Sequence, residues 1–168
     1  MKYIFVDPSG SFNEGKGHTG IACISDMNWD TLTIESVSAS HYSSRHEYWK
    51  AIAISIISKI TLDTHVIIES FMIRNVGYVI GKMPETIQLI GMLRYYLEKL
   101  GYTFVFQAPT LAKSRFRDIT LPRYVPGFTY DKDANRYYLN GKMTNDHMRD
   151  ALKHLLYFKK YGKLKKGG

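Results

Sequence analysis

The 168-residue sequence predicts one α/β domain with a mixed five-stranded sheet flanked by helices, in which the first three strands are antiparallel and the later strands are parallel. Three observations lead to this fold class. Three β-rich runs come first and are joined by turn-like segments, which is typical of an antiparallel meander. Two more β-rich runs alternate with helical patterns, and such long crossovers usually join parallel strands. One core is expected, because single domains commonly contain roughly 100–200 residues.

The first predicted strand runs from Lys2 to Asp7. Pro8 follows at once and cannot donate a ladder hydrogen bond, so Asp7 lies at the exit of the strand. Residues 9–18 contain three glycines and are expected to form a wide hairpin loop. Taken alone, a carboxylate at this place is more often a solvated turn former than part of a site.

Residues 19–25 and 31–38 are rich in β-branched side chains and flank a turn-prone segment, which predicts the second and third strands. A helix comes next, because Ser44 and Glu47 have the spacing of a capping box. This helix is expected to end near Leu62. Its apolar residues recur at intervals of three and four: Trp49, Ile52, Ala53, Ile56, Ile57 and Ile60.

Residues 65–69 predict a short parallel strand that ends, like the first strand, in a carboxylate, here Glu69. A second helix should run from Pro84 to a stop at Gly101, and a further strand should cover residues 102–107. The apolar stripe expected on this second helix consists of Ile87, Ile90, Leu93, Leu97 and Leu100.

Asp146 is expected to cap a last helix, which buries Met148, Ala151, Leu152 and Leu155. On an adjacent stripe, His147, Asp150 and His154 stand at i, i+3 and i+7, so the three residues share one face. His154 is expected to be an ordinary surface histidine of this helix.

Residues 117–143 predict a long loop rich in aromatic and basic residues, and loops of this length tend to be functional or mobile. Contact with DNA and packing as a lid are equally good interpretations of this loop. The chain continues into a basic tail at 159–168, which either touches phosphates or keeps the end of the chain solvated.

Composition favours a polyanionic partner, because 23 Lys and Arg residues against 15 Asp and Glu residues give a net charge of +8. The single cysteine, Cys23, excludes an intrachain disulfide and offers no zinc cluster, which suits a reducing cytosol. No apolar run is long enough to span a membrane, and the first residues lack the pattern of a signal peptide. We therefore expect a cytoplasmic protein without a membrane partner.

Three acidic residues occupy comparable places: Asp7 and Glu69 at strand ends, and Asp150 on a helix after the sheet. If the three converge, their charges repel unless a cation neutralises them, and a divalent metal is the common solution. Oxygen ligands with a neighbouring histidine suit Mg²⁺ or Mn²⁺ better than zinc. A pair of such ions could activate water and stabilise the leaving oxygen of a phosphodiester.

These residues resemble a known family when they are taken together. Asp7-Pro8-Ser9-Gly10 with Thr19-Gly20, Val66-Ile67-Ile68-Glu69 with Phe71-Met72 and Arg74-Asn75, and His147-x-x-Asp150-Ala151 are similar to motifs of the RuvC family of Holliday-junction resolvases, especially its bacteriophage branch. The loop after Asp7 is longer than in the cellular enzymes, and Phe71 lies one residue nearer Glu69 than the aromatic residue of that family.

The resemblance implies an RNase H-like fold, a homodimer, and cleavage of branched DNA in the cytoplasm of a bacterium or a phage-infected cell. It also implies two Mg²⁺ or Mn²⁺ ions per active site and no nucleotide cofactor, with Asp7, Glu69, His147 and Asp150 as catalytic and metal-binding residues. The residues expected to contact DNA are Phe71, Arg74, Lys113, Arg115, Arg117, Lys159, Lys160 and Lys163.

Two other functions compete with this interpretation. Actin-like ATPases also begin with a strand, an acidic turn and a hairpin, but they need a second domain that we do not expect in 168 residues. A non-catalytic DNA-binding protein would explain the charge of +8 equally well. It would not explain three carboxylates near the expected DNA surface, because unneutralised carboxylates weaken phosphate binding.

Overall fold

The computed structural model describes residues 1–12, 15–70 and 84–162. Its main sheet has the strand order β3-β2-β1-β4-β5, with β3, β2 and β1 antiparallel and β1, β4 and β5 parallel. The predicted fold class is therefore confirmed. The strands of this sheet are β1 (Lys2–Asp7), β2 (His18–Ser25), β3 (Asn28–Ser38), β4 (Thr64–Glu69) and β5 (Phe104–Gln107).

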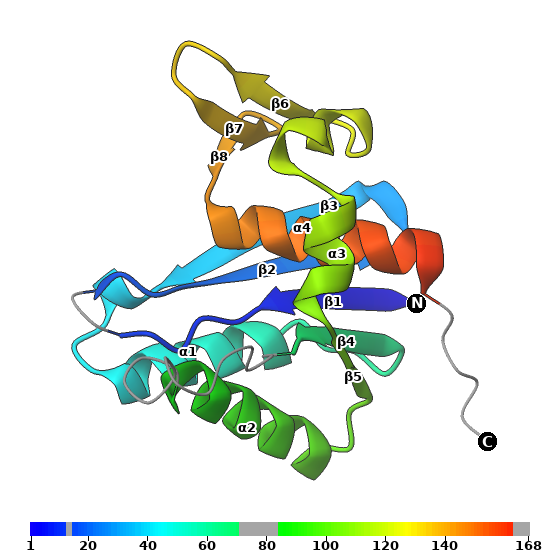
Figure 1. Cartoon of the computed structure of the whole chain (residues 1–168). Coiled ribbons are helices and arrows are strands. Elements are labelled where there is room, and N and C mark those ends of the chain that lie inside the picture. Colours follow the sequence, from blue (N-terminus) through cyan, green and yellow to red (C-terminus); the bar gives the residue numbers. More distant parts are fainter. Residues whose placement is uncertain (13–14, 71–83, 163–168) are drawn as a thin grey trace.

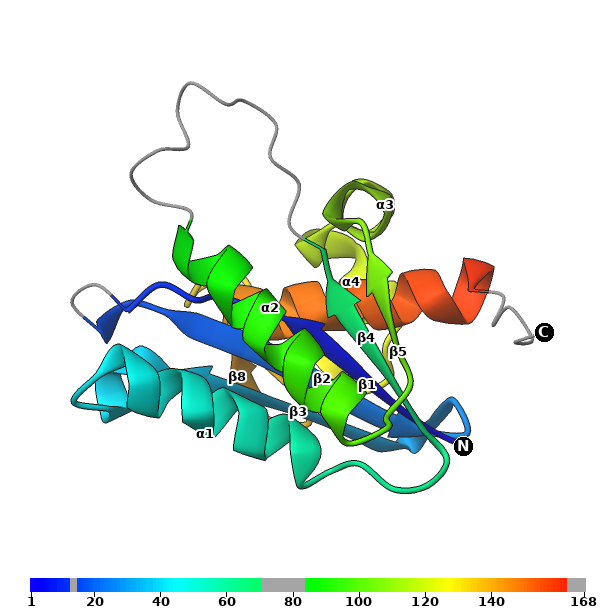
Figure 2. The same ribbon diagram turned by 90° about the horizontal axis from the view of Figure 1, so that it is seen from below.

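Helices cover both faces of the sheet (Figures 1 and 2). The helices α1 (Arg45–Ile57) and α2 (Pro84–Lys99) lie on one face, and α4 (Asp146–Tyr161) crosses the other face. A short helix, α3 (Pro109–Arg115), follows β5 directly and packs near α4. The described residues also contain the 3₁₀ helices η2 (Ala39–His41) and η4 (Asp118–Arg123).

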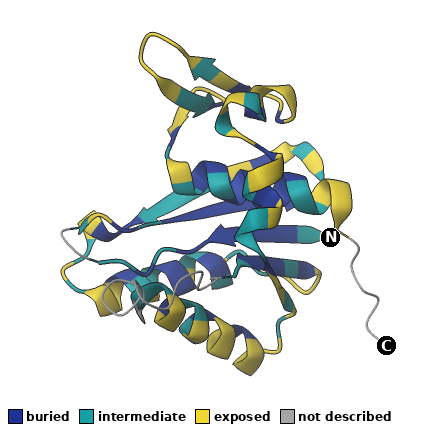
Figure 3. Ribbon diagram, viewed as in Figure 1, coloured by how far each residue is buried: buried dark blue, intermediate teal, exposed yellow. Residues whose placement is uncertain are grey.

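Alternation along the strands divides the core into two halves. In β1, Tyr3 and Phe5 pack in the half beneath α4, whereas Ile4 and Val6 pack in the half covered by α1 and α2. Successive side chains of a strand point to opposite faces, so the next odd-numbered residue, Asp7, belongs to the α4 side. Both halves are completely buried at their centres, as the dark ribbon in Figure 3 shows.

The helices α1 and α2 begin where predicted, but the end of α1 and the buried stripe of α2 differ from the prediction. The Ser44 side chain caps α1 by accepting a hydrogen bond from the Glu47 amide at 3.2 Å, but the helix ends at Ile57 instead of near Leu62. In α2 the buried stripe is Leu89, Leu93 and Leu97, a strict four-residue spacing. The expected members Ile87 and Leu100 are 41% and 48% exposed, because this stripe turns them toward solvent.

The prediction of a long loop at 117–143 is wrong. After η4 the chain forms an antiparallel three-stranded sheet, made of β6 (Phe128–Asp131), β7 (Arg136–Leu139) and β8 (Lys142–Thr144), which lies beyond α4 in Figure 1. Asn140 and Gly141 make the two-residue turn between β7 and β8, both with positive φ, as a type I′ turn requires. Phe128 and Leu139 face inward and join the core beneath α4.

The last helix has the predicted buried stripe, because Met148, Ala151, Leu152 and Leu155 are at most 4% exposed. Its N-cap is Asn145 instead of Asp146, since the Asn145 side chain accepts a hydrogen bond from the Met148 amide at 2.9 Å. Among the described residues, no helix is long and apolar enough to cross a membrane.

Candidate metal centre

Three polar side chains form a row across the carboxyl ends of the parallel strands. Asp7 ends β1, Glu69 ends β4 and Gln107 ends β5, and Glu69 pairs with Gln107 in the ladder. Asp7 and Glu69 lie two residues beyond Phe5 and Ile67, which pack on the α4 half of the core, and Gln107 lies beside Glu69 in the ladder. Because side chains alternate along a strand, the row faces α4.

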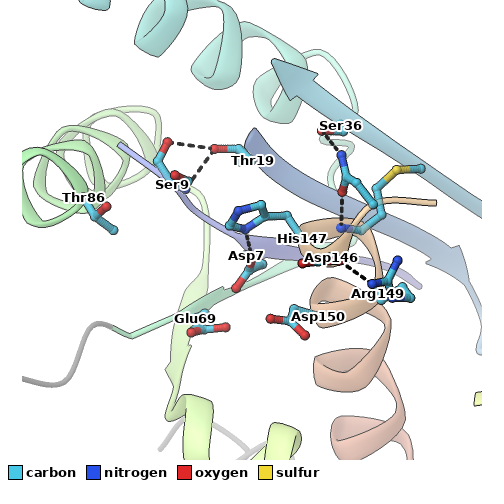
Figure 4. A network of polar contacts seen from close by, with 12 residues as sticks. Asp7, Ser9, Thr19, Ser36, Glu69, Thr86, Asp146, His147, Arg149 and Asp150 are labelled. Atoms are coloured by element: carbon cyan, nitrogen blue, oxygen red, sulfur yellow. Dashed lines mark hydrogen bonds and ion pairs between the residues drawn. The ribbon is translucent and has the colours of Figure 1, made fainter. Parts of the chain in front are cut away.

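Helix α4 contributes the other side of the site. His147, Asp150 and His154 share one face of the helix, as predicted, and this face lies over the row. The His147 Nδ1 contacts Asp7 Oδ2, and the His154 Nε2 lies 2.7 Å from Glu69 Oε2. Figure 4 shows the carboxylates of Asp7, Glu69 and Asp150 pointing toward one another. Three predicted site carboxylates from β1, β4 and α4 therefore meet at one place.

Gly20 allows α4 to come this close to the sheet. It pairs with Asp7 across β1 and β2, and a Cβ built on Gly20 would lie 2.0 Å from the His147 carbonyl oxygen. Any side chain at this position would push the start of α4 away. The neighbouring Thr19 hydroxyl accepts a hydrogen bond from the Ser9 amide at 3.1 Å, which fixes the chain as it leaves Asp7.

Lys113 of α3 lies at the centre of the carboxylates. Its Nζ is 3.2 Å from Asp7 Oδ1, 2.9 Å from Glu69 Oε2 and 2.7 Å from Asp150 Oδ2. We expected Lys113 to contact DNA, and DNA contact by this residue stays a prediction. In the structure its ammonium forms ion pairs inside the site. The cause is the immediate turn from β5 into α3, which brings this side chain back over the strand ends.

Burial and nearby charges shift the pKa values of Asp7, Glu69 and His147. Burial raises the pKa of Asp7 to about 6, and the nearby Glu69 adds to the rise. Burial also acts to raise the pKa of Glu69, but its hydrogen bonds with His154 and Asp7 and the charge of Lys113 outweigh it and hold the pKa at about 2. The pKa of His147 is raised, because its hydrogen bond to Asp7 and the Asp7 charge outweigh burial.

His154 differs most from its prediction. The expected surface histidine is completely buried, with Nδ1 against Gln107 Oε1 and Nε2 against Glu69. Sequence reasoning missed Gln107 altogether. Two signals could have found the pair: His154 shares a helix stripe with His147 and Asp150, and Gln107 ends its strand as Asp7 and Glu69 end theirs.

A second ionic network leads away from Asp150. Lys153, which is 9% exposed, donates to Asp150 Oδ1 at 2.6 Å and also pairs with Asp118 of η4. The Arg149 Nε donates to Asp118 Oδ2 at 2.7 Å, and its guanidinium lies 4.7 Å from the centre of the Tyr137 ring. The carboxylate site is thus connected by charges to η4 and to the small β6–β8 sheet.

The remaining predicted residues lie away from the carboxylates or outside the described part of the chain. Lys159 donates to the Met27 carbonyl at 2.8 Å and covers the Trp29 ring, whereas Arg115 and Lys160 lie over the Tyr161 ring. Arg117 is exposed before η4. Phe71, Arg74 and Lys163 are outside the described residues, and DNA contact by any of these residues stays a prediction.

The donor set suits a divalent cation. The ammonium of Lys113 already identifies a point within reach of all three carboxylates, and ligand atoms of Asp7, Glu69 and His154 lie within 4.8 Å of one another. Carboxylate oxygens are hard ligands of the kind that Mg²⁺ and Mn²⁺ bind in proteins. The site therefore fits a metal centre that is rich in oxygen ligands and has imidazole at its edge.

A mixed sheet with carboxylates at the ends of β1 and β4 beneath a helix defines a class of protein, the RNase H-like α/β domains. Neither a protein-family model nor a curated protein matches the sequence. The chain is similar to T. thermophilus RuvC in complex with a Holliday junction substrate, with a TM-score of 0.65 and 16% identity over 99% of this chain and 98% of that one.

A second solved structure, described as Thermus thermophilus RuvC, aligns with a TM-score of 0.59 and 14% identity over 96% of this chain and 97% of that one. At such low identity the similarity concerns the fold. The chain therefore has an RNase H-like fold similar to that of these RuvC structures.

Proposed function

We propose that this chain is a RuvC-type Holliday-junction resolvase of the bacteriophage branch. In this proposal residues 1–168 act as one nuclease domain that nicks four-way or otherwise branched DNA in the cytoplasm, as a homodimer with Mg²⁺ or Mn²⁺. One observation carries the proposal: carboxylates from β1, β4 and α4 converge so closely that the single ammonium of Lys113 reaches all three, at 2.7–3.2 Å.

The proposed substrate is supported by charge and by the fold. The net charge of +8 favours association with a polyanion. The similar RuvC structure was solved with a Holliday junction substrate, and its likeness covers 99% of this chain. The four strands of a four-way junction form symmetry-related pairs. Two sites related by a two-fold axis can engage both strands of one pair, which a single site cannot do.

Asp7, Glu69, Asp150 and His147 are the residues that would hold the ions. Two divalent ions, when bound, would supply an activated water and stabilisation of the leaving oxygen in phosphodiester hydrolysis. Asp7 is well placed for this purpose, because its oxygens are shared between His147 and Lys113. His147 holds the Asp7 carboxylate from one side and keeps it directed toward Glu69.

The ion pairs of Lys113 favour one other function, in which the protein has the same fold and binds branched DNA without cleaving it. The ion pairs of Lys113 neutralise the carboxylates without any metal, so the centre could serve stability alone. In that case the protein would bind junctions equally well with and without divalent ions. Cleavage distinguishes the two functions directly.

The deciding experiment incubates purified protein with a labelled synthetic four-way junction and with linear duplex of the same sequence, with Mg²⁺, with Mn²⁺ or with a chelator. We expect symmetric nicks in the junction only when a divalent ion is present. Asp7→Asn, Glu69→Gln and Asp150→Asn should each reduce cleavage about a hundredfold or more while junction binding persists. Binding without cleavage of any branched substrate would support the non-catalytic function.

A further inference from the structure

The imidazole of His154 is held between two oxygen-bearing side chains at the end of the sheet. Its Nδ1 contacts Gln107 Oε1 on β5, and its Nε2 lies 2.7 Å from Glu69 Oε2 on β4. The His154 side chain is only 1% exposed, so water cannot complete its hydrogen bonds. Every polar atom of the ring is therefore assigned to one of these two neighbours.

A neutral imidazole carries one N–H, and its second nitrogen offers a lone pair. If Gln107 Oε1 accepts the proton of Nδ1, the lone pair of Nε2 points at the Glu69 carboxylate, which offers only lone pairs. Two acceptors at 2.7 Å repel each other unless a proton or a metal cation lies between them. Histidines that bind metals commonly donate their other N–H to an oxygen in this manner.

We propose that His154 is a metal ligand through Nε2, together with Asp7 and Glu69, and that Gln107 fixes the tautomer that permits it. The inference rests on the metal centre of the proposed function and adds a second histidine ligand to it, beside His147. The candidate ligand atoms of these three residues lie within 4.8 Å of one another. Their elements differ, since Asp7 comes from β1, Glu69 from β4 and His154 from α4.

The nitrogen ligand has a consequence for metal preference. Mg²⁺ binds oxygen ligands and gains little from imidazole, whereas transition metals such as Mn²⁺ accept imidazole readily. The centre is therefore expected to bind Mn²⁺ in preference to Mg²⁺ by a larger factor than the three carboxylates and His147 would give without His154.

Two other arrangements of the same side chains exist. With the Gln107 amide turned over, its NH₂ group donates to Nδ1, and His154 donates from Nε2 to Glu69. With both ring nitrogens protonated, His154 donates to Gln107 Oε1 and to Glu69 at once. In both cases His154 would be a positioning residue that orients Glu69 without touching the ion. These arrangements differ from the proposed one in whether a His154 nitrogen is bonded to the metal.

The test is Mn²⁺ binding to the DNA-free protein, followed by electron paramagnetic resonance with detection of coupled nitrogen. His154→Gln places a side-chain amide where Nε2 lies, so it can still donate to Glu69. We expect this variant to lose the nitrogen coupling from residue 154 and about tenfold or more of its Mn²⁺ affinity, with Mg²⁺ affinity changed about threefold or less. His147→Gln is the matched control and should keep the coupling that His154 produces.

An unchanged nitrogen signal and an unchanged ratio of Mn²⁺ to Mg²⁺ affinity in His154→Gln would overturn the inference and leave His154 as a positioning residue. If His154→Gln does not fold, Gln107→Leu decides instead. It keeps the ring and both carboxylates but removes the oxygen that fixes the tautomer, so the same affinity ratio must fall. Absence of any metal binding by the unmodified protein would instead refute the metal centre, and with it the proposed function.

Discussion

At the scale of single residues, Asp7 combines a buried position with the role of metal ligand that we propose for it, which requires its charged form. Burial raises its pKa to about 6, so the folded protein holds a proton there that an exposed aspartate would release near pH 4. His147 adds to this, because its raised pKa also keeps a proton in the site. A divalent ion has to displace both protons before it can bind.

Metal affinity should therefore fall as the pH is lowered. Above both raised pKa values the two protons are absent and the affinity is constant. The affinity should drop by up to tenfold per pH unit as the pH falls through the pKa of His147, which lies above 6.5, and more steeply below about pH 6, where Asp7 is protonated as well. Calorimetric titration of Mg²⁺ or Mn²⁺ between about pH 5 and pH 8 measures this slope. Asp7→Asn, which carries no titrating proton, is the control and should weaken the dependence.

Lys113 makes a different prediction at the same scale. Its ammonium competes with any metal for the oxygens of three carboxylates, yet without it these carboxylates repel one another. Lys113→Met should lower the metal-free stability by roughly 1–3 kcal/mol, since the side chain is about one-third exposed and its ion pairs are partly screened.

Added Mg²⁺ should restore more stability to this variant than to the unmodified protein, because the ion replaces the missing positive charge. Thermal unfolding with and without Mg²⁺ measures the difference. Lys132→Met, in the exposed turn between β6 and β7, is a control that should behave like the parent protein. Equal responses of Lys113→Met and Lys132→Met would show that Lys113 does not share its position with a metal.

At the scale of elements, the approach of α4 to β2 determines whether the site exists. Gly20→Ala places a Cβ 2.0 Å from the His147 carbonyl oxygen, and overpacking of this kind typically costs about 1–3 kcal/mol. We expect this variant to lose stability and cleavage together, because α4 carries His147 and Asp150. Chemical denaturation and the junction assay measure both effects.

Gly91→Ala is the matched control for this prediction. Gly91 lies in α2, and a Cβ built there meets no atom within 4 Å. Alanine favours a helix over glycine by up to about 1 kcal/mol, so this variant should be slightly more stable and fully active. A fully active Gly20→Ala protein would mean that His147 and Asp150 still reach the site when α4 lies farther from β2.

The elements also show what could be predicted from the sequence. Runs rich in β-branched and apolar residues predicted the five strands of the main sheet. Apolar residues at intervals of three and four, with capping residues, predicted the helices α1, α2 and α4. These features are local in the sequence. The segment at 117–143 was interpreted as a loop although Asn140-Gly141 is a strong hairpin signal. Its strands have only three or four residues, too few to display an alternation.

The site was predictable in its carboxylates and not in its partners. Strand ends and helix stripes are local features, so Asp7, Glu69 and Asp150 could be selected from the sequence. Lys113 reaches the site through contacts 44 and 106 residues apart, which no local pattern reports. His154 and Gln107 do carry local signals, a helix stripe and a strand end, but their contact with each other and with Glu69 joins elements 47 and 85 residues apart. A charged or polar residue in such a position looks like any surface residue.

At the scale of the whole molecule, the charge of +8 predicts binding that depends strongly on salt. Truncation after Tyr161 removes Lys163, Lys165 and Lys166. If these lysines contact phosphates, the slope of log affinity against log salt should become shallower by up to about 3, for branched and linear DNA alike. An unchanged slope would show that they only keep the chain soluble.

The proposed homodimer can be tested on the outer face of α1 and α2. There Ile54 and Tyr96, which are 56% and 41% exposed, border an apolar cavity of about 400 Å³. Exposed apolar surface of this kind is common at contacts between chains. We expect a sedimenting mass near twice the 19.4 kDa of one chain, and dissociation in Ile54→Glu. Leu62→Glu, at a fully exposed position outside this cavity, should leave the mass unchanged.

The span of the site along the chain has a consequence during synthesis. Asp7 and His147 are bonded across 140 positions, and Asp150 lies farther still toward the end of α4. A ribosome that has made the whole of the main sheet has therefore not yet made the helix that completes the centre. A nascent chain can fold β1 to β5 without gathering its carboxylates. If the protein is a nuclease, DNA near a translating ribosome is safe from it until α4 has emerged and docked against Gly20.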